Sequence, residues 1–161
     1  MSSKQCVIGL DLGTTGVRSI AFDQKGVIIT SNYQEIRQSY PNPGWVEQDP
    51  LNILNVTLEL LHKTAQDLMG YSILTVGITN QRETTVLWNS KTGLPIYPAI
   101  VWQDIRTTKY CASLKKEHFL RVKEKTGLFI DAYFSATKIK WILDNVPDAK
   151  NCLNKGILKF G

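Results

Sequence analysis

The 161-residue chain has 43% hydrophobic and 20% charged residues, which allows a globular domain with a buried core and argues against disorder. Its net charge of +5 comes from Lys and Arg residues spread along the sequence without a basic block, so a small anionic ligand accounts for the charge and we expect no nucleic-acid partner. The cysteines Cys6, Cys111 and Cys152 are odd in number and far apart, a pattern that argues against a disulfide framework and a zinc site and suits a reducing cytoplasm.

The first part of the chain predicts three short strands. The apolar runs Cys6–Leu10 and Ser19–Phe22 are joined by the tight turn Asp11–Gly16. A second turn signal, Asp23–Gly26, leads into the apolar run Val27–Ile29. We therefore expect an antiparallel meander at the start of the fold.

A helix is predicted after the loop at residues 34–47. Asp49 offers a side-chain cap, Pro50 suits the first helical position, and Gly70 stands where a C-terminal cap belongs. Apolar residues recur at steps of three and four on the face expected to be buried: Leu51, Leu54, Leu58, Leu61, Ala65 and Leu68. We expect this face to pack on the sheet.

Apolar runs in the second half predict further strands at 73–78, 84–88 and 99–102, the first of them a buried one. The polar segments 79–83 and 103–106 follow two of these strands. Because open α/β sheets bind ligands at strand ends, both segments are candidates for a site.

Two more helices are predicted at 107–117, with Tyr110, Cys111 and Leu114 facing inward, and at 135–146, where Pro147 ends the helix. The last residues read as a strand with no polar tail after it, so we expect the chain to be incomplete at its C-terminus. No segment is long and apolar enough to span a bilayer, and we expect no membrane partner.

The turn after the first strand has the composition of a phosphate-binding loop. Its glycines let backbone N–H groups approach an anion, its threonines add hydroxyl donors, and its carboxylate can organise a hydrated Mg²⁺. A plain hairpin, in which both glycines take positive φ, explains the composition equally well. The nearby arginine favours a phosphate site because a guanidinium binds phosphate oxygens in a bidentate fork. The candidate residues are Asp11, Gly13, Thr14, Thr15, Gly16 and Arg18.

A second set of residues suits a polyol. Asn80–Glu83 places donors beside a carboxylate, which is the combination that neighbouring hydroxyl groups need. Trp102 can form an apolar wall for the carbon side of a ligand, and Tyr133 can offer a hydroxyl group. An ordinary solvated loop, a core Trp and a Tyr bonded to a backbone carbonyl are the alternatives. Asp104 and Arg106 are either a site pair or a local salt bridge that caps the next helix.

Five segments carry motifs in chain order: DLGTTGVRSIAFD at 11–23, YPNPGWVEQDP at 40–50, GITNQRETTVLW at 77–88, AIVWQDIRT at 99–107 and TGLFIDAYFSATKIKWIL at 126–143. Together they closely resemble the amino-terminal domain of the FGGY carbohydrate kinases, in the glycerol kinase branch. The resemblance runs over almost the whole chain. It implies an α/β domain of the ribonuclease-H-like, actin-like ATPase class. Residues 1–161 would form most of this domain, with its remainder and a second domain outside the chain.

For the first site, the resemblance implies that the turn Gly13–Gly16 and Arg18 hold the phosphates of ATP. Asp11 would act on Mg²⁺ through water. For the second site, it implies a small polyol, glycerol or a similar one.

The polyol would be bound by Arg82, Glu83 and Tyr133, with Trp102 as the wall facing its carbon atoms. The implied reaction is ATP-dependent phosphorylation of glycerol to glycerol 3-phosphate. The general base is expected beyond Gly161, so we expect the fragment to contain no catalytic residue and to be inactive alone. The family resemblance is compatible with a homo-oligomer of the intact enzyme.

The chain departs from the family pattern at three places. Gly16 stands where these kinases often carry Ser, which removes a hydroxyl contact to phosphate. Leu12 replaces a commonly polar residue. Asp104-Ile105 replaces the usual Cys-Arg, and Asp104 with Arg106 resembles the W-x-D-x-R pattern of other sugar kinases. Another FGGY kinase is therefore one alternative, and a Mg²⁺-dependent nuclease and a non-catalytic nucleotide-binding module are two more.

Overall fold

The computed structural model describes residues 4–161 and divides the chain into two compact units. The first unit is formed by Met1–Gln38 and Leu51–Gln81, and the second by Ser39–Pro50 and Arg82–Gly161.

The first unit is built on a four-stranded mixed sheet in the order β3-β2-β1-β5. β2 pairs antiparallel with β1 and with β3, whereas β1 and β5 are parallel. The elements of this unit are β1 (Lys4–Leu12), β2 (Gly16–Asp23), β3 (Ile28–Glu35), α1 (Pro50–Asp67) and β5 (Tyr71–Thr79). The predicted opening meander is confirmed, including its second hairpin, where Gly26 has a φ of +79°.

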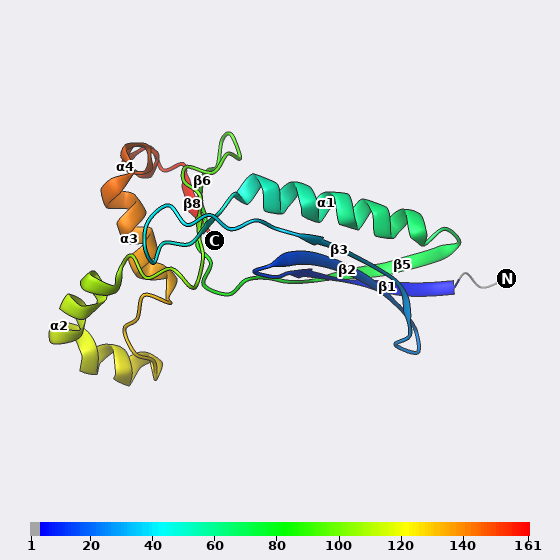
Figure 1. Cartoon of the computed structure of the whole chain (residues 1–161), viewed down its shortest axis with the longest axis horizontal. Coiled ribbons are helices and arrows are strands. Elements are labelled where there is room, and N and C mark those ends of the chain that lie inside the picture. Colours follow the sequence, from blue (N-terminus) through cyan, green and yellow to red (C-terminus); the bar gives the residue numbers. More distant parts are fainter. Residues whose placement is uncertain (1–3) are drawn as a thin grey trace. The chain divides into compact units, whose positions relative to one another are not determined.

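Helix α1 lies along one face of this sheet (Figure 1). Alternate residues of β1, namely Cys6, Ile8 and Leu10, are buried on the covered face. The helix contributes Val56 and Leu60 to the same core.

The predicted buried face was right toward the end of the helix, where Leu61 packs against the core and Leu68 is buried. It was wrong at the start, since Leu51, Leu54 and Leu58 are 37–54% exposed. The helix is rotated because two threonines belong to its buried stripe. One of them, Thr64, accepts a hydrogen bond from the buried Asn32 amide over 3.1 Å. Apolar spacing alone does not detect such a polar contact.

Strand β5 forms where a buried strand was predicted, but its burial was wrongly predicted. Ile73, Leu74, Val76 and Ile78 are 38–70% exposed. The reason is that β5 is the outermost strand of the sheet within residues 4–161.

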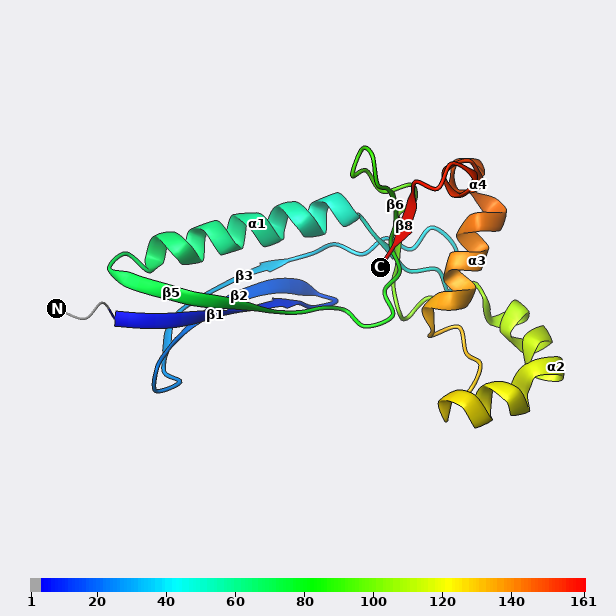
Figure 2. The ribbon, with the colours of Figure 1, turned by 180° about the vertical axis from the view of Figure 1, so that it is seen from behind.

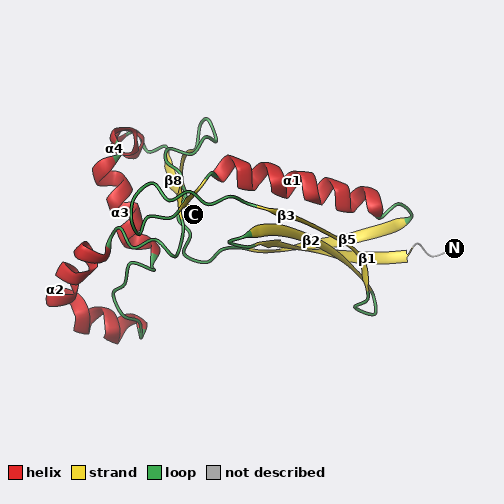
Figure 3. Ribbon diagram, viewed as in Figure 1, coloured by secondary structure: helices red, strands yellow, loops and turns green. Residues whose placement is uncertain are grey.

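The second unit contains two short sheets, β4 with β7 and β6 with β8, and three helices (Figures 2 and 3). Its elements are β4 (Glu47–Gln48), β6 (Leu87–Asn89), β7 (Ala99–Ile100), α2 (Thr108–Thr126), α3 (Ser135–Asn145), α4 (Pro147–Asn154) and β8 (Leu158–Phe160). Its main core is formed by Leu87, Ile100, Ile142 and Ala149.

The predicted elements of this unit exist with different bounds. The strands are shorter than predicted and α2 is longer. Pro147 ends α3 as predicted, but it also opens α4, because proline suits the first position of a helix. Of the residues expected to face inward on α2, Cys111 is buried and Tyr110 is 41% exposed.

Candidate functional site

The turn between β1 and β2 is closed by its own backbone. The Gly13 N–H donates to the Gly16 carbonyl over 2.9 Å, and the Thr15 carbonyl accepts from the Ile36 N–H over 3.0 Å. Neither Gly13 nor Gly16 has a positive φ, so that part of the hairpin expectation is wrong. Gly16 is required by space instead, because a Cβ there would lie 2.6 Å from the Gln34 carbonyl oxygen.

A row of polar side chains crosses the sheet beside this turn. Asp11 lies opposite Arg18 in the β1–β2 register and opposite Thr79 in the β1–β5 register, and Arg18 lies opposite Tyr33 in the β2–β3 register. Residues directly opposite each other share a face, so the four side chains lie on the face that α1 does not cover. All four are exposed. The row therefore offers a cation, a carboxylate and two hydroxyl groups at the carboxyl ends of β1 and β5.

The loop after β5 supports the turn. The Gln81 side-chain amide donates to the Gly13 carbonyl over 3.0 Å. The sequence placed Gln81 among residues for a polyol, whereas its hydrogen bond to Gly13 belongs to the phosphate-type turn.

In the second unit, Glu83, Trp102 and Tyr133 form a cluster. The rings of Trp102 and Tyr133 meet edge-on with centroids 6.1 Å apart. The Trp102 backbone N–H donates to the Thr84 hydroxyl over 3.3 Å, which joins the ends of the predicted strands 84–88 and 99–102.

Glu83 caps helix α3 from a distance in sequence. Its Oε2 accepts from the backbone N–H of Ser135 over 2.8 Å and from the Ser135 hydroxyl over 2.7 Å. Ser135 is the first residue of α3, so the carboxylate satisfies an N–H that has no partner within the helix. Within residues 4–161, the other oxygen, Oε1, has no hydrogen bond and remains available to a ligand.

Lys138 connects two of the predicted site residues. Its Nζ donates to the carbonyl oxygens of Glu83, over 2.8 Å, and of Tyr133, over 2.7 Å. Glu83 has a φ of +66°, an uncommon conformation for this residue type, and these bonds hold its backbone there. The Lys138 side chain is fully buried, and loss of hydration lowers the pKa of its ammonium to about 8.

Sequence reasoning missed Lys138 and Ser135. A signal for Lys138 was present, because it lies one helical turn before the apolar residue Ile142 and so shares its helix face. No local signal pointed to Ser135, whose partner lies 52 residues earlier in the chain.

Arg82 is exposed, and within the described residues it makes no hydrogen bond or ion pair. The Tyr133 hydroxyl likewise has no hydrogen-bond partner there, so the alternative in which it binds a backbone carbonyl does not hold. The structure thus groups Glu83, Trp102 and Tyr133, and it leaves the guanidinium of Arg82 in solvent.

Asp104 and Arg106 form a buried salt bridge. Arg106 donates to both carboxylate oxygens of Asp104 over 2.8–2.9 Å, and it also donates to Glu47 over 2.8 Å. Asp104 further accepts from the Val46 N–H over 2.7 Å. Burial opposes the charge, but the bonds to Asp104 and Glu47 outweigh it and raise the pKa of the Arg106 guanidinium.

The salt-bridge alternative is therefore confirmed for this pair. The capping role is wrong, since no side chain forms a capping hydrogen bond at the N-cap residue of α2, Thr107. Arg106 instead lies over the rings of Trp45 and Trp141, with its guanidinium carbon 3.9 Å and 4.6 Å from the two ring centroids.

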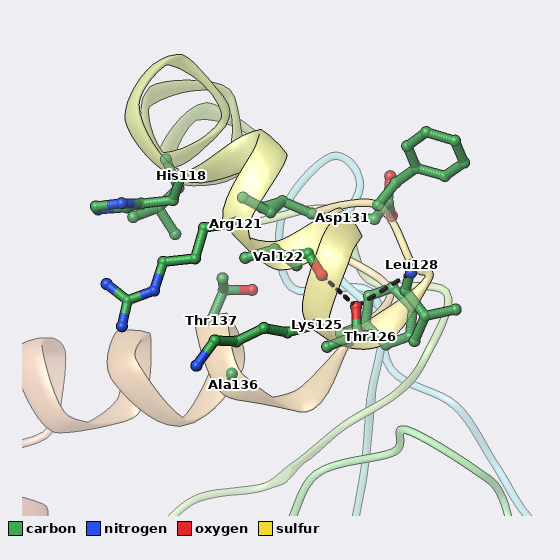
Figure 4. Close-up of a pocket in the computed structure, with 13 residues that line it drawn as sticks. His118, Arg121, Val122, Lys125, Thr126, Leu128, Asp131, Ala136 and Thr137 are labelled. Atoms are coloured by element: carbon green, nitrogen blue, oxygen red, sulfur yellow. Dashed lines mark hydrogen bonds between the residues drawn. The ribbon is translucent and has the colours of Figure 1, made fainter.

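A cavity of about 550 Å³ lies elsewhere in the second unit, between α2, the segment at 128–131 and the start of α3 (Figure 4). Its walls are mainly apolar, and His118, Arg121 and Lys125 of α2 contribute polar groups. None of the predicted site residues lines it.

The FGGY family of carbohydrate kinases, N-terminal domain, matches residues 6–159. The chain belongs to this FGGY family. It is 49% identical over 164 residues to a glycerol kinase of Leptospira biflexa, covering 100% of the chain and 33% of the relative. It is 51% identical over 162 residues to a glycerol kinase of Burkholderia cenocepacia, and this match covers 98% of the chain and 32% of the relative.

Among solved structures, a Plasmodium falciparum glycerol kinase crystallised with ADP matches this FGGY chain with a TM-score of 0.94 and 32% identity. The match covers 100% of the chain and 33% of that structure. The chain thus spans about a third of the length of these relatives. The predicted mixed α/β fold of the actin-like ATPase class is confirmed.

The residues of the first site suit the Mg²⁺ that a nucleotide-using kinase employs. Within residues 4–161, no group of three His, Cys, Asp or Glu side chains could hold a metal ion by itself. Mg²⁺ in nucleotide sites keeps several waters and uses one or two carboxylates with substrate phosphates, and the exposed Asp11 beside the turn offers such a carboxylate.

Across the described residues, no helix of this FGGY chain is both long and apolar enough to cross a bilayer.

Proposed function

We propose that the protein phosphorylates glycerol with MgATP, giving glycerol 3-phosphate and ADP. The observation that carries this proposal is the identity of about 50% to proteins named glycerol kinase, which extends over essentially the whole chain. Because the chain spans about a third of those relatives, we further propose that the complete reaction needs the remainder of a full-length protein.

The turn and the polar row supply the nucleotide side of the reaction. Arg18 and the hydroxyl groups of Thr14 and Thr15 would bind phosphate oxygens by charge-assisted hydrogen bonds. Mg²⁺, held by Asp11 through water, supplies neutralisation of charge on the phosphates when bound.

The second cluster supplies the alcohol side. Glu83 Oε1 would accept a hydrogen bond from one hydroxyl of glycerol, and Arg82 would donate to its oxygens. Trp102 and Tyr133 would face the carbon atoms. A terminal oxygen of glycerol forms the new bond to the γ-phosphorus while the bond to the bridging oxygen of ADP breaks, and the hydroxyl proton leaves to a base outside this chain. Catalysis then depends on alignment and electrostatics.

The departure at Asp104 does not argue for a larger sugar. Asp104 is 1% exposed and the Arg106 side chain is fully buried, so both are used for packing. The nuclease alternative lacks support, since it needs clustered carboxylates, and no acidic cluster for a metal ion is present within residues 4–161. We expect the protein to act in the cytoplasm, where its three buried, unpaired cysteines stay reduced.

The test is a kinetic comparison of full-length protein with its Arg82→Ala variant. We expect ATP-dependent turnover of glycerol in preference to a five-carbon sugar such as xylulose. Arg82→Ala should raise the KM for glycerol about 10- to 100-fold, as expected for loss of a charge-assisted hydrogen bond of ~1.5–3 kcal/mol, with little change in the KM for ATP.

Arg121→Ala, an exposed arginine on α2, is the matched control and should leave both KM values unchanged. Preference for the sugar would favour another FGGY kinase. Nucleotide binding without any phosphorylated product would favour the non-catalytic alternative.

A further inference from the structure

Tyr33 occupies the space that a side chain at position 16 would need. A Cβ on residue 16 would lie 2.5 Å from the Tyr33 hydroxyl oxygen and 2.6 Å from its Cε2. Such distances are far inside van der Waals contact, so the aromatic side chain and any residue larger than glycine exclude each other. The Tyr33 hydroxyl thus lies where a side chain on residue 16 would begin.

Tyr33 also contacts the arginine of the site. The β2–β3 register places Arg18 directly opposite Tyr33, and the guanidinium carbon is 5.3 Å from the ring centroid. This distance falls in the range of a cation–π contact. The ring therefore supports Arg18 without occupying the N–H donors of the guanidinium. Within residues 4–161, the Arg18 side chain makes no hydrogen bond.

The hydroxyl of Tyr33 reaches back to the turn. It lies 3.5 Å from the Thr15 carbonyl oxygen, at the long limit of a hydrogen bond. The side chain is 48% exposed on the face that carries Asp11 and Arg18. An exposed hydroxyl held this weakly can turn to an anion bound at the turn.

We propose that Tyr33 is an additional nucleotide-phosphate-binding residue. Its hydroxyl donates to a phosphate oxygen from the place of the residue 16 side chain, and its ring orients Arg18. This inference rests on the proposed function, in which the turn binds a nucleotide.

The test is calorimetric titration of full-length protein with MgATP and with MgADP. Tyr33→Phe keeps the ring and removes the hydroxyl, and we expect about tenfold weaker nucleotide binding, the loss of one hydrogen bond to a charged group. The KM for glycerol should not change. Tyr110→Phe removes an exposed hydroxyl on α2 and is the matched control.

A second variant separates the hydroxyl from the ring. Tyr33→Ala should weaken nucleotide binding further than Tyr33→Phe, because Arg18 also loses its support.

The outcomes distinguish the two claims. A wild-type protein that binds no nucleotide would overturn the proposed function, and this inference with it. If the wild type binds MgATP and Tyr33→Phe binds it equally well, the proposed function stands and the role of the Tyr33 hydroxyl is refuted. Equal affinities of Tyr33→Ala and Tyr33→Phe for MgATP would refute the support of Arg18 by the ring.

Discussion

Lys138 carries a buried ammonium group that holds the backbone of Glu83 and Tyr133 in place. Its two hydrogen bonds end on the carbonyl oxygens of Glu83 and Tyr133, whose side chains are candidate ligands of the alcohol. The charge is not needed for these bonds, because a neutral amine also donates. Loss of hydration therefore dominates and lowers the pKa of Lys138 to about 8.

The lowered pKa predicts a pH dependence of stability. Lys138 titrates near pH 8 in the folded protein and near 10.5 in the unfolded chain, so between these values the unfolded state binds more protons. The free energy of unfolding contributed by Lys138 must then rise with pH across this window, by at most about 1.4 kcal/mol per pH unit.

The measurement is urea unfolding of the wild type and of Lys138→Met at pH 7, 8, 9 and 10. Other titrating groups cancel in the difference between the two proteins. We expect the stability of the wild type relative to Lys138→Met to increase from pH 8 to pH 10. Lys140→Met, an exposed lysine of the same helix, should show no such trend. A flat or falling difference for Lys138→Met would contradict the assignment.

At the scale of the elements, the buried network of Arg106 organises the second unit. Arg106 joins Asp104, which follows β7, to Glu47 of β4, and its guanidinium lies against Trp141 of α3. A planar guanidinium with five N–H donors can bind both carboxylates and contact the aromatic rings at once, which an ammonium group cannot do.

We therefore expect Arg106→Lys to be a severe substitution. A lysine leaves part of the carboxylate surface of Asp104 and Glu47 buried without a donor, and the expected loss is about 3 kcal/mol in the free energy of unfolding. Urea unfolding at pH 7 measures it. Lys109→Arg, an exchange in the opposite direction at an exposed position of α2, is the control and should change stability by less than about 0.5 kcal/mol. Equal stability of Arg106→Lys and the wild type would show that the network is dispensable.

The sequence predicted elements better than it predicted their faces. The meander, α1 and α3 were found because turn residues and caps are local signals. The rotation of α1 was missed because Thr64 is buried through a hydrogen bond to Asn32, a partner 32 residues away. Of the second site, Glu83 and Trp102 were singled out because they lie at the ends of predicted strands, and Tyr133 was joined to them through the family resemblance. Lys138 was missed because a lysine on an apolar face is normally exposed.

At the scale of the whole molecule, the chain contains the groups proposed to bind MgATP and glycerol but spans about a third of its glycerol kinase relatives. Phosphoryl transfer needs a site that excludes water, since water competes with the alcohol and weakens the electrostatic interactions. Within the described residues, the nucleotide and polyol clusters are exposed or partly exposed. The groups that would enclose them, and the base, are therefore expected outside the chain.

The prediction is that the 161-residue chain alone has no glycerol kinase turnover, whereas full-length protein does. A coupled spectrophotometric assay that follows the release of ADP measures the turnover, with MgATP and glycerol both present in excess. Full-length protein under the same conditions is the positive control. Turnover by the isolated chain above the uncatalysed background would show that the base and the enclosure lie within residues 1–161, and the assignment of both to the remainder of the enzyme would be wrong. If the isolated chain is inactive but regains turnover when a separately produced remainder of the protein is added, the missing groups must come from that remainder, because the chain itself is unchanged between the two assays.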